Sequence, residues 1–238
     1  MKKSQTNRKG FTLIELLTVI AIIGILAALA VPTIGIGMDK VRQLVASNNL
    51  SQIAKSYVSY MQEGTNGRQI TNKGDEPERG TASTVASVAE ILARKAGLVD
   101  AEVWYVASDD AINNTIPKTV LSDGTDGTNQ LREVKPISWA VVVNAKKNPK
   151  AGKSAYPIAW LRGLQTNGEW TEDAPFGKDV GFVAFADGSV KKYSNLLAEE
   201  DQFRSADGKR DSSSYEDAIG SNTSSGGLTP TRLEDQGA

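Results

Sequence analysis

The apolar residues of this chain are concentrated in one long run near its start. Residues 11–30, FTLIELLTVIAIIGILAALA, contain one charged residue, Glu15, and their apolar side chains fall on every side of a helical wheel. With a rise of 1.5 Å per residue, such a helix is about 30 Å long, which matches the hydrocarbon thickness of a bilayer. The pattern therefore predicts a transmembrane helix over residues 11–30.

The apolar pattern continues at helical spacing beyond this run. It predicts that the N-terminal helix extends over residues 11–62 and that its second half packs under a sheet. Residues 64–84 are polar and rich in Gly, which predicts a long exposed loop. A second helix is expected over residues 85–96, ended by Gly97. The stripe expected to face the sheet comprises Met38, Val41, Val45, Ile53, Tyr57 and Met61.

The rest of the chain alternates short apolar runs with turn-forming residues. Five segments rich in β-branched and aromatic residues predict strands, and the last two flank Asp187-Gly188, which predicts a hairpin with a type I′ turn. The fold class is therefore α+β, a long N-terminal helix packed against a small antiparallel sheet. The predicted strands are residues 103–107, 137–144, 157–162, 181–186 and 189–193.

The predicted organisation has four parts. Residues 1–10 are a short basic segment, here called the leader, residues 11–62 are the helix, and residues 63–198 are expected to form an extracytoplasmic globular domain. Residues 199–238 hold nine acidic and four basic residues with little apolar content, which predicts a flexible acidic tail. The basic loop over residues 145–155 is expected to be a solvated connection.

The composition excludes several kinds of chemistry. The chain has no Cys and no His, so it forms neither disulfides nor thiolate metal sites, and it lacks the commonest general base. An exported hydrolase would need a pair of carboxylates that no motif marks. The sequence therefore predicts that the protein is not an enzyme.

The charges near the start predict how the chain crosses a membrane. The leader holds four basic residues and no acid, so the positive-inside rule keeps the N-terminus in the cytoplasm and sends the rest across. Without the leader the chain has 23 basic and 28 acidic residues, which disfavours nucleic-acid binding. The residues expected to set the orientation are Lys2, Lys3, Arg8 and Lys9.

The junction between leader and helix carries a recognisable motif. The run KGFTLIELL, residues 9–17, resembles the processing site of type IV prepilins and of type II secretion pseudopilins. The resemblance implies that a prepilin peptidase cuts after Gly10 and that the new terminus, Phe11, is N-methylated. It also implies that Glu15 is the assembly glutamate, that Pro32 is the helix-bending proline and that the fold is pilin-like.

The chemistry of Glu15 can be argued from the residues themselves. Cleavage after Gly10 leaves an ammonium on Phe11, about one helical turn from Glu15. A carboxylate at the centre of a membrane helix costs about 2.5 to 3.5 kcal/mol and less near an end, so Glu15 is tolerated but seeks a partner. The ammonium of a neighbouring subunit is such a partner, and in the families that the chain resembles this pairing draws subunits into a filament.

We therefore predict a structural subunit of a type II secretion pseudopilus. The resemblance implies as partners the prepilin peptidase, identical and related subunits, the inner-membrane assembly platform and the membrane itself. It places the chain in the bacterial inner membrane as a single-pass protein with a periplasmic domain. The alternatives are a type IV pilus subunit for adhesion or motility, and a membrane-anchored binding protein.

Two further alternatives concern the apolar run. Ala28-Leu29-Ala30 is a possible signal-peptidase site, but the run exceeds an ordinary signal-peptide core and contains a glutamate. A plain anchor would not explain Glu15.

The C-terminal half carries two weaker signals. The stretch FVAFADGSVKKY, residues 182–193, resembles the "DG" motif of some prepilin-type proteins, although this chain lacks the histidine that accompanies it there. Residues 122–129, SDGTDGTN, do not have the spacing of an EF-hand. No cofactor is expected, and calcium enters only because pseudopilins can hold it in a C-terminal loop.

Overall fold

The chain divides into two compact units, residues 1–43 and residues 44–238. The computed structural model describes residues 11–63, 67–112, 114–124, 127–178, 180–197, 201–221 and 229–235, apart from the side chains of residues 30–34 and 36.

The N-terminal helix α1 spans Leu13–Gln62, which confirms the helix predicted over residues 11–62. In the second unit its buried face is formed by Ala46, Leu50, Ile53 and Tyr57, which recur every three or four residues. Tyr57 also donates a hydrogen bond to the carbonyl oxygen of Val142, at 2.7 Å, and so ties the helix to the sheet.

Part of the predicted stripe of α1 was wrong. Met38, Val41 and Val45 are about half exposed, at 49%, 52% and 49%. Met38 lies twelve residues before Leu50, and Val41 and Val45 lie sixteen and twelve residues before Tyr57. At about 100° per residue, these spacings place the three side chains on another side of the helix. The buried face follows 3.6-residue spacing from Ala46 onward, which the broader predicted stripe did not respect.

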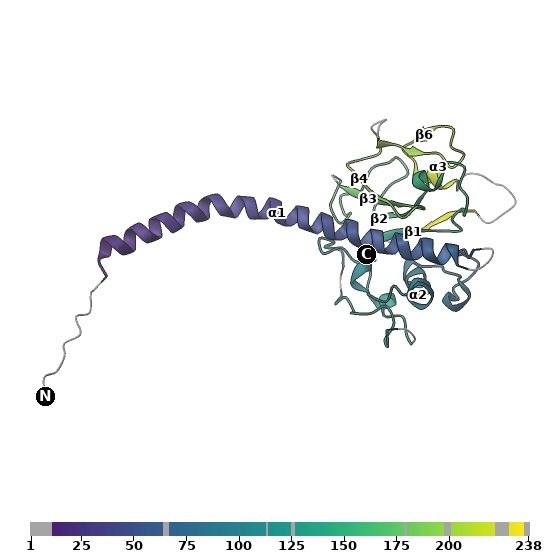
Figure 1. Ribbon diagram of the computed structural model, residues 1–238, viewed down its shortest axis with the longest axis horizontal. Helices are drawn as coiled ribbons and strands as arrows, with labels where there is room; N and C mark the ends of the chain where they lie inside the picture. Colours follow the sequence, from purple (N-terminus) through teal and green to yellow (C-terminus); the bar gives the residue numbers. More distant parts are fainter. Residues whose placement is uncertain are drawn as a thin grey trace. The chain divides into compact units, whose positions relative to one another are not determined.

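A five-stranded antiparallel sheet forms the main layer of the second unit, in the order β4-β3-β2-β1-β7. Every residue of β1, β2 and β3 is buried, as their continuous apolar sequences require. Figure 1 shows the sheet above the C-terminal half of α1 and α2 below it. The strands are β1 Trp139–Val143, β2 Pro157–Leu161, β3 Gly181–Phe185, β4 Val190–Tyr193 and β7 Thr231–Leu233, so four of the five predicted strands are confirmed.

Helix α2 spans Val85–Ala96, as predicted. The side chain of Thr84 caps its start by accepting a hydrogen bond from the backbone N–H of Ser87, and Gly97 ends it with φ of 73°. The 3₁₀ helices in the described part of the chain are η1 Pro77–Arg79, η2 Glu102–Trp104, η3 Gln130–Glu133 and η4 Lys153–Ala155.

The strand predicted over residues 103–107 was wrong, because this segment contains the 3₁₀ helix η2. The carboxylate of Asp100 accepts a hydrogen bond from the backbone N–H of Glu102 at 2.9 Å, which starts a turn instead of a strand. Val103 and Trp104 are buried nonetheless. The apolar run indicates burial in the core. A short apolar run cannot distinguish a buried strand from a buried turn.

The long exposed loop predicted over residues 64–84 was also wrong for its described part. Ile70, Pro77 and Ala82 are buried, and Thr71 pairs with Thr81 in an isolated bridge. The few apolar residues of this polar segment fix it onto the core.

The flexible tail predicted over residues 199–238 needs the largest correction. Its described residues form the hairpin β5 Phe203–Arg204 and β6 Asp211–Ser212, the helix α3 Tyr215–Ile219 and the sheet strand β7. Phe203, Tyr215, Ala218 and Ile219 are buried. Composition averaged over forty residues concealed these few apolar positions, which are sufficient to bind the segment to the domain.

The hairpin predicted at Asp187-Gly188 is confirmed, but its turn type is not. Phe185 accepts from the N–H of Gly188 at 2.8 Å and donates its own N–H to Ser189 at 2.9 Å. Gly188 has φ of 84°, whereas the φ of Asp187 is not positive. The loop is thus a type I turn followed by a left-handed glycine, because a type I′ turn needs positive φ at both central residues.

Among the described residues, no helix has both the length and the hydropathy of a membrane-crossing segment. The transmembrane helix predicted over residues 11–30 is therefore not confirmed.

Candidate functional site

The start of α1 is closed by a pair of reciprocal hydrogen bonds. Glu15 accepts from the backbone N–H of Thr12 at 2.9 Å and from its hydroxyl at 2.7 Å. The backbone N–H of Glu15 in turn donates to the hydroxyl oxygen of Thr12 at 3.3 Å. This is a capping box, in which a threonine at the N-cap and a glutamate three residues later satisfy each other's free backbone donors.

The capping box leaves part of Glu15 available. Both bonds that the carboxylate accepts end on Oε2, so a cation can still bind to Oε1. Phe11, which would carry the new ammonium after cleavage, precedes Thr12 and is 80% exposed. The geometry thus places Glu15, the predicted assembly glutamate, close in the chain to the expected terminus, with its carboxylate held by two hydrogen bonds from Thr12.

The first turns of α1 expose an unusual amount of apolar surface. Leu13, Ile14 and Leu29 are between 68% and 80% exposed, and every described residue from 11 to 29 is exposed. Isolated exposed apolar side chains are common on soluble proteins, but a contiguous surface of this kind marks contact with a partner or an apolar phase.

The remaining predicted site residues are described only in part. Gly10 and the four basic leader residues, Lys2, Lys3, Arg8 and Lys9, lie outside the described residues. Helix α1 continues through position 32, where the side chain of Pro32 is likewise not described. Asp187 and Gly188 form the β3–β4 turn.

Thr12 is the residue of the candidate site that the sequence interpretation missed. The signal was present as Thr-Leu-Ile-Glu, the threonine-x-x-glutamate pattern of a capping box before an apolar run.

Two comparisons with known proteins agree with this site. A prokaryotic N-terminal methylation motif matches residues 5–31, which include the capping box. The type IV wide pilus major component PilA4 of Thermus thermophilus is 34% identical over 110 residues, which cover 44% of this chain and 84% of the relative. The chain belongs to the type IV prepilin-like family.

Other members of this prepilin-like family match over longer or shorter stretches. The type IV major pilin protein PilE1 of Neisseria gonorrhoeae is 29% identical over 182 residues, which cover 74% of this chain and 89% of the relative. The type IV major pilin protein PilA of Myxococcus xanthus is 40% identical over 83 residues, covering 34% of this chain and 38% of the relative. No solved structure matches the chain significantly.

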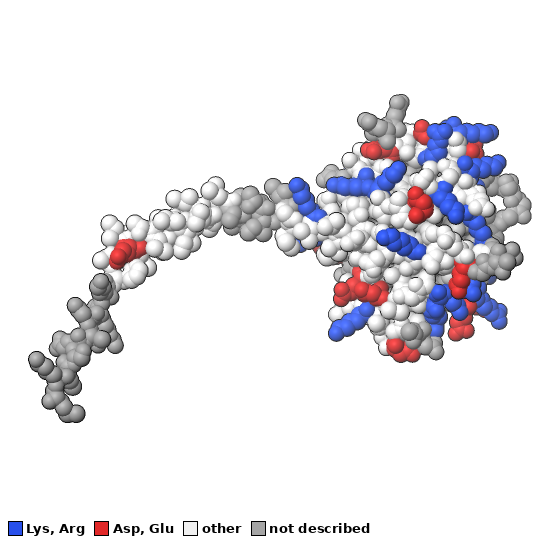
Figure 2. Space-filling model, in the orientation of Figure 1, with Lys and Arg blue, Asp and Glu red and all other residues white. Residues whose placement is uncertain are grey.

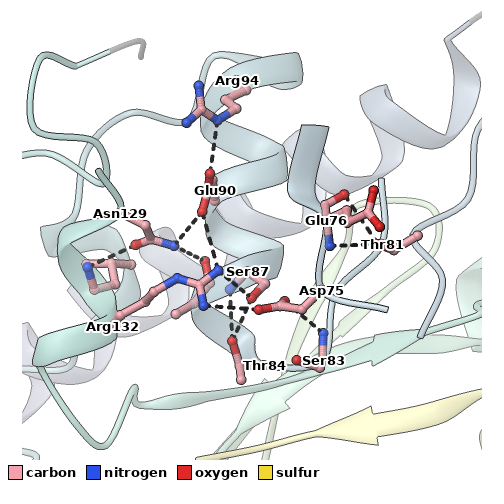
Figure 3. A network of polar contacts seen from close by, with 12 residues as sticks. Asp75, Glu76, Thr81, Ser83, Thr84, Ser87, Glu90, Arg94, Asn129 and Arg132 are labelled. Carbon is pink, nitrogen blue, oxygen red and sulfur yellow. Dashed lines mark hydrogen bonds and ion pairs between the residues drawn. The ribbon is translucent and has the colours of Figure 1, made fainter. Parts of the chain in front are cut away.

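A polar network connects α2 to two loops of the globular unit, as Figure 3 shows. Glu90 of α2 accepts from Arg94 at 3.1 Å and from the side-chain amide of Asn129 at 3.1 Å. Arg132 of η3 lies 3.7 Å from Glu90 and donates to Asp75 at 3.0 Å. Every acid of the network has a basic partner. The network therefore holds α2, η3 and the loop around Asp75 together, and we call it the structural clamp.

The pKa of Asp75 makes this clamp sensitive to acid. Burial acts to raise its pKa, but hydrogen bonds from Ser87, Ser83 and Arg132 outweigh burial and hold the pKa below its ordinary value. A carboxyl group whose pKa is lower in the folded state stabilises the fold above its unfolded pKa of about 3.9, and this contribution is lost as the pH falls through the folded pKa.

We therefore expect Asp75→Asn to lower the free energy of unfolding at pH 7 by about 1 kcal/mol, because the pair is partly exposed. The same variant should lose less stability than the unchanged chain between pH 5 and pH 3. Urea denaturation followed by tryptophan fluorescence measures both effects. Glu76→Gln is the control, since its ion pair with Arg79 is more than half exposed on both sides. Equal pH profiles for the Asp75→Asn chain and the unchanged chain would contradict the assignment.

A second polar site is fully buried. The carboxylate of Asp109 accepts from Nε of Arg162 at 2.9 Å and from Nη2 at 2.5 Å, and the hydroxyl of Ser138 donates to it at 2.7 Å. The side chains of Asp109 and Arg162 are 0% and 3% exposed. These bonds fix the loop after η2 to the ends of β1 and β2.

The calcium prediction is only partly covered. The described residues contain no cluster of three or more acidic side chains that could hold a metal ion. Asp126 of the candidate loop lies outside them, so calcium binding stays a prediction.

Proposed function

We propose that the protein is a filament subunit of the type IV pilin kind, assembled through its N-terminal helix. The observation that carries the proposal is the exposed apolar start of α1 with Glu15 held by Thr12, inside a matched N-terminal methylation motif. Relatives named as major pilins support it.

In the proposed mechanism, prepilin peptidase cleaves after Gly10 and the freed Phe11 is methylated. The capping box fixes the Glu15 carboxylate on the first turn, where it pairs with the Phe11 ammonium of a neighbouring copy. The exposed apolar side chains of residues 13–29 then pack against those of other copies, because this packing keeps their apolar surface out of water once the subunit leaves the bilayer. Burial of the helices would supply the stability and the charge pair the register.

The proposed location is the bacterial inner membrane before assembly, with the N-terminus in the cytoplasm and the globular unit outside it. The basic leader supports this orientation. The inner-membrane assembly platform and related subunits are the partners that such a route needs.

Two kinds of filament fit these features. The relatives named as type IV pilus proteins favour a pilus for adhesion or motility. A type II secretion pseudopilus is the second candidate, and the absence of cysteine favours it, because a C-terminal disulfide loop is common among pilus subunits.

We expect Glu15→Gln to reduce the yield of sheared filaments at least tenfold, because an amide cannot form the ion pair. The yield is measured by immunoblotting of sheared material against total protein, together with electron microscopy of the cells and a comparison of secreted proteins. Surface filaments without a change in secretion indicate a pilus, and a secretion defect indicates a pseudopilus.

Asp39→Asn is the matched control, because Asp39 is an exposed acid of the same helix whose ion pair within the described part of the chain is with Arg42, three residues along the helix. Mass spectrometry should find N-methyl-Phe11 in the control, in the Glu15→Gln variant and in the unchanged chain. Unchanged filament yield and secretion in the Glu15→Gln strain, or a terminus at Val31, would contradict the proposal.

A further inference from the structure

The basic loop over residues 145–155 does not stand alone in the structure. The turn of the β5–β6 hairpin packs against it, so that a Cβ at Gly208 would lie 3.2 Å from the carbonyl oxygen of Lys150. The hydroxyl of Tyr156, at the end of the loop, donates to the carbonyl oxygen of Ile219 at 3.2 Å. Two segments far apart in the sequence therefore form one surface, residues 145–155 and 203–212, which we call the basic surface.

The basic surface is strongly charged in a chain that is otherwise acidic. It holds seven basic and two acidic residues, whereas the rest of residues 11–238 holds 16 basic and 26 acidic residues. In Figure 2, Lys and Arg side chains gather over the region of β6 and α3. Lys150, Lys153 and Lys209 are exposed, and their ammonium groups form no ion pair with any described residue.

A segment of the same unit has the opposite charge. Residues 100–133 hold seven acidic and two basic residues, although one of these acids, Asp109, is buried and paired with Arg162. Of the two bases, Arg132 is already paired with Asp75 and Glu90. Glu102, Asp110 and Glu133 are exposed. We call residues 100–133 the acidic segment.

We propose that the basic surface of one copy binds the acidic segment of a neighbouring copy in the filament. The inference rests on the proposed function and specifies which surfaces of the globular units meet. Its basis is the charge complementarity of the two surfaces. Every copy carries both of them, so in a filament each surface meets its complement at high local concentration. A contact between two different patches is heterologous, and such contacts build open helical assemblies.

The contact should depend on salt, since exposed charges are screened over about 8 Å at physiological ionic strength. The contact should also favour one register of the filament over others. A wrong register would place two basic surfaces or two acidic segments together, and like charges repel.

The first test is charge reversal in the full-length chain with its assembly machinery. Lys150→Glu with Lys153→Glu should lower the yield of sheared filaments about tenfold, because like charges would then face each other. Lys73→Glu with Lys95→Glu is the matched control, since it makes the same charge change at two exposed lysines outside the basic surface and should change the yield less than twofold. Adding Glu102→Lys and Asp110→Lys to the reversed chain should restore most of the yield.

The second test needs no variant. Filaments that contain both ¹⁵N-labelled and unlabelled copies are treated with a carbodiimide, which joins a lysine to a carboxylate in direct contact. Mass spectrometry should find mixed-label links from Lys150, Lys153 or Lys209 to the acidic segment.

Two results would overturn the proposal. The first is an unchanged filament yield in the chain with Lys150→Glu and Lys153→Glu, whether or not that chain loses adhesion to anionic surfaces. The second is that all mixed-label links from these lysines lead to segments other than the acidic segment. In either case loss of filaments in the Glu15→Gln strain still supports the proposed function, so the two proposals fail separately.

Discussion

Replacing Asp109 by alanine should lower the free energy of unfolding by about 3 kcal/mol, because it leaves the buried guanidinium of Arg162 with only the exposed carboxylate of Asp173, 3.6 Å away, as an ion-pair partner. The carboxylate bonds two nitrogens of Arg162 and the hydroxyl of Ser138, and neither charged side chain is more than 3% exposed. Urea denaturation followed by fluorescence measures the loss, since all four tryptophans are buried in the globular unit.

Glu172→Ala provides the control for this prediction. Its ion pair with Lys178 is similar in length, 2.8 Å, but the two side chains are 84% and 61% exposed. We expect this change to leave the free energy of unfolding almost unchanged, because solvent screens an exposed pair. The double variant of Asp109→Ala with Arg162→Ala should lose less than the sum of the two single variants, because the second change removes the buried charge. A loss below 1 kcal/mol for Asp109→Ala would show that the pair is hydrated.

Gly181→Ala should destabilise the globular unit by about 3 kcal/mol through overpacking alone. A Cβ at Gly181 would lie 2.0 Å from Cζ2 of Trp170 and 2.4 Å from Cη2, far inside van der Waals contact. The ring has little room to move, since Trp170 is 1% exposed and its indole N–H donates to the carbonyl oxygen of Leu161 at 3.2 Å. Chemical denaturation measures the loss.

Gly97→Ala separates this steric effect from the backbone effect of glycine. A Cβ at Gly97 meets nothing within 4 Å, but the residue has φ of 73°, so the cost there is backbone strain of about 1 kcal/mol. Trp170→Leu should remove part of the penalty of Gly181→Ala, giving a double variant more stable than additivity predicts. Equal losses in the two alanine variants would mean that the ring adjusts at no cost.

The sequence was informative where one physical signal dominated. The apolar run and the helical spacing predicted α1, and β-branched runs bounded by turn residues predicted four strands of the sheet, because burial on both faces requires such sequences. The N-terminal motif predicted the family. The sequence also contains the threonine-x-x-glutamate pattern that predicts Thr12 as the partner of Glu15, but the interpretation considered only the glutamate.

The failures share a cause, which is that composition over a window does not reveal single anchoring residues. The acidic C-terminal segment is held by Phe203, Tyr215 and Ile219, and by Arg232, which lies 4.5 Å from the ring of Tyr215. The pair of Asp109 and Arg162 is separated by more than fifty residues in the sequence. No local pattern marks such a pair, because it forms only when the fold brings β2 beside the loop after η2.

The two outer strands of the sheet matter for a subunit that packs beside its own copies. An open strand offers free backbone donors and acceptors to any other strand, which is how amyloid begins. Here β4 ends the sheet on one side with Lys191 and Lys192 exposed, and β7 ends it on the other side with only three residues, directly after Pro230. Both margins discourage cross-chain strand pairing, so globular units that touch through their side chains keep their sheets separate.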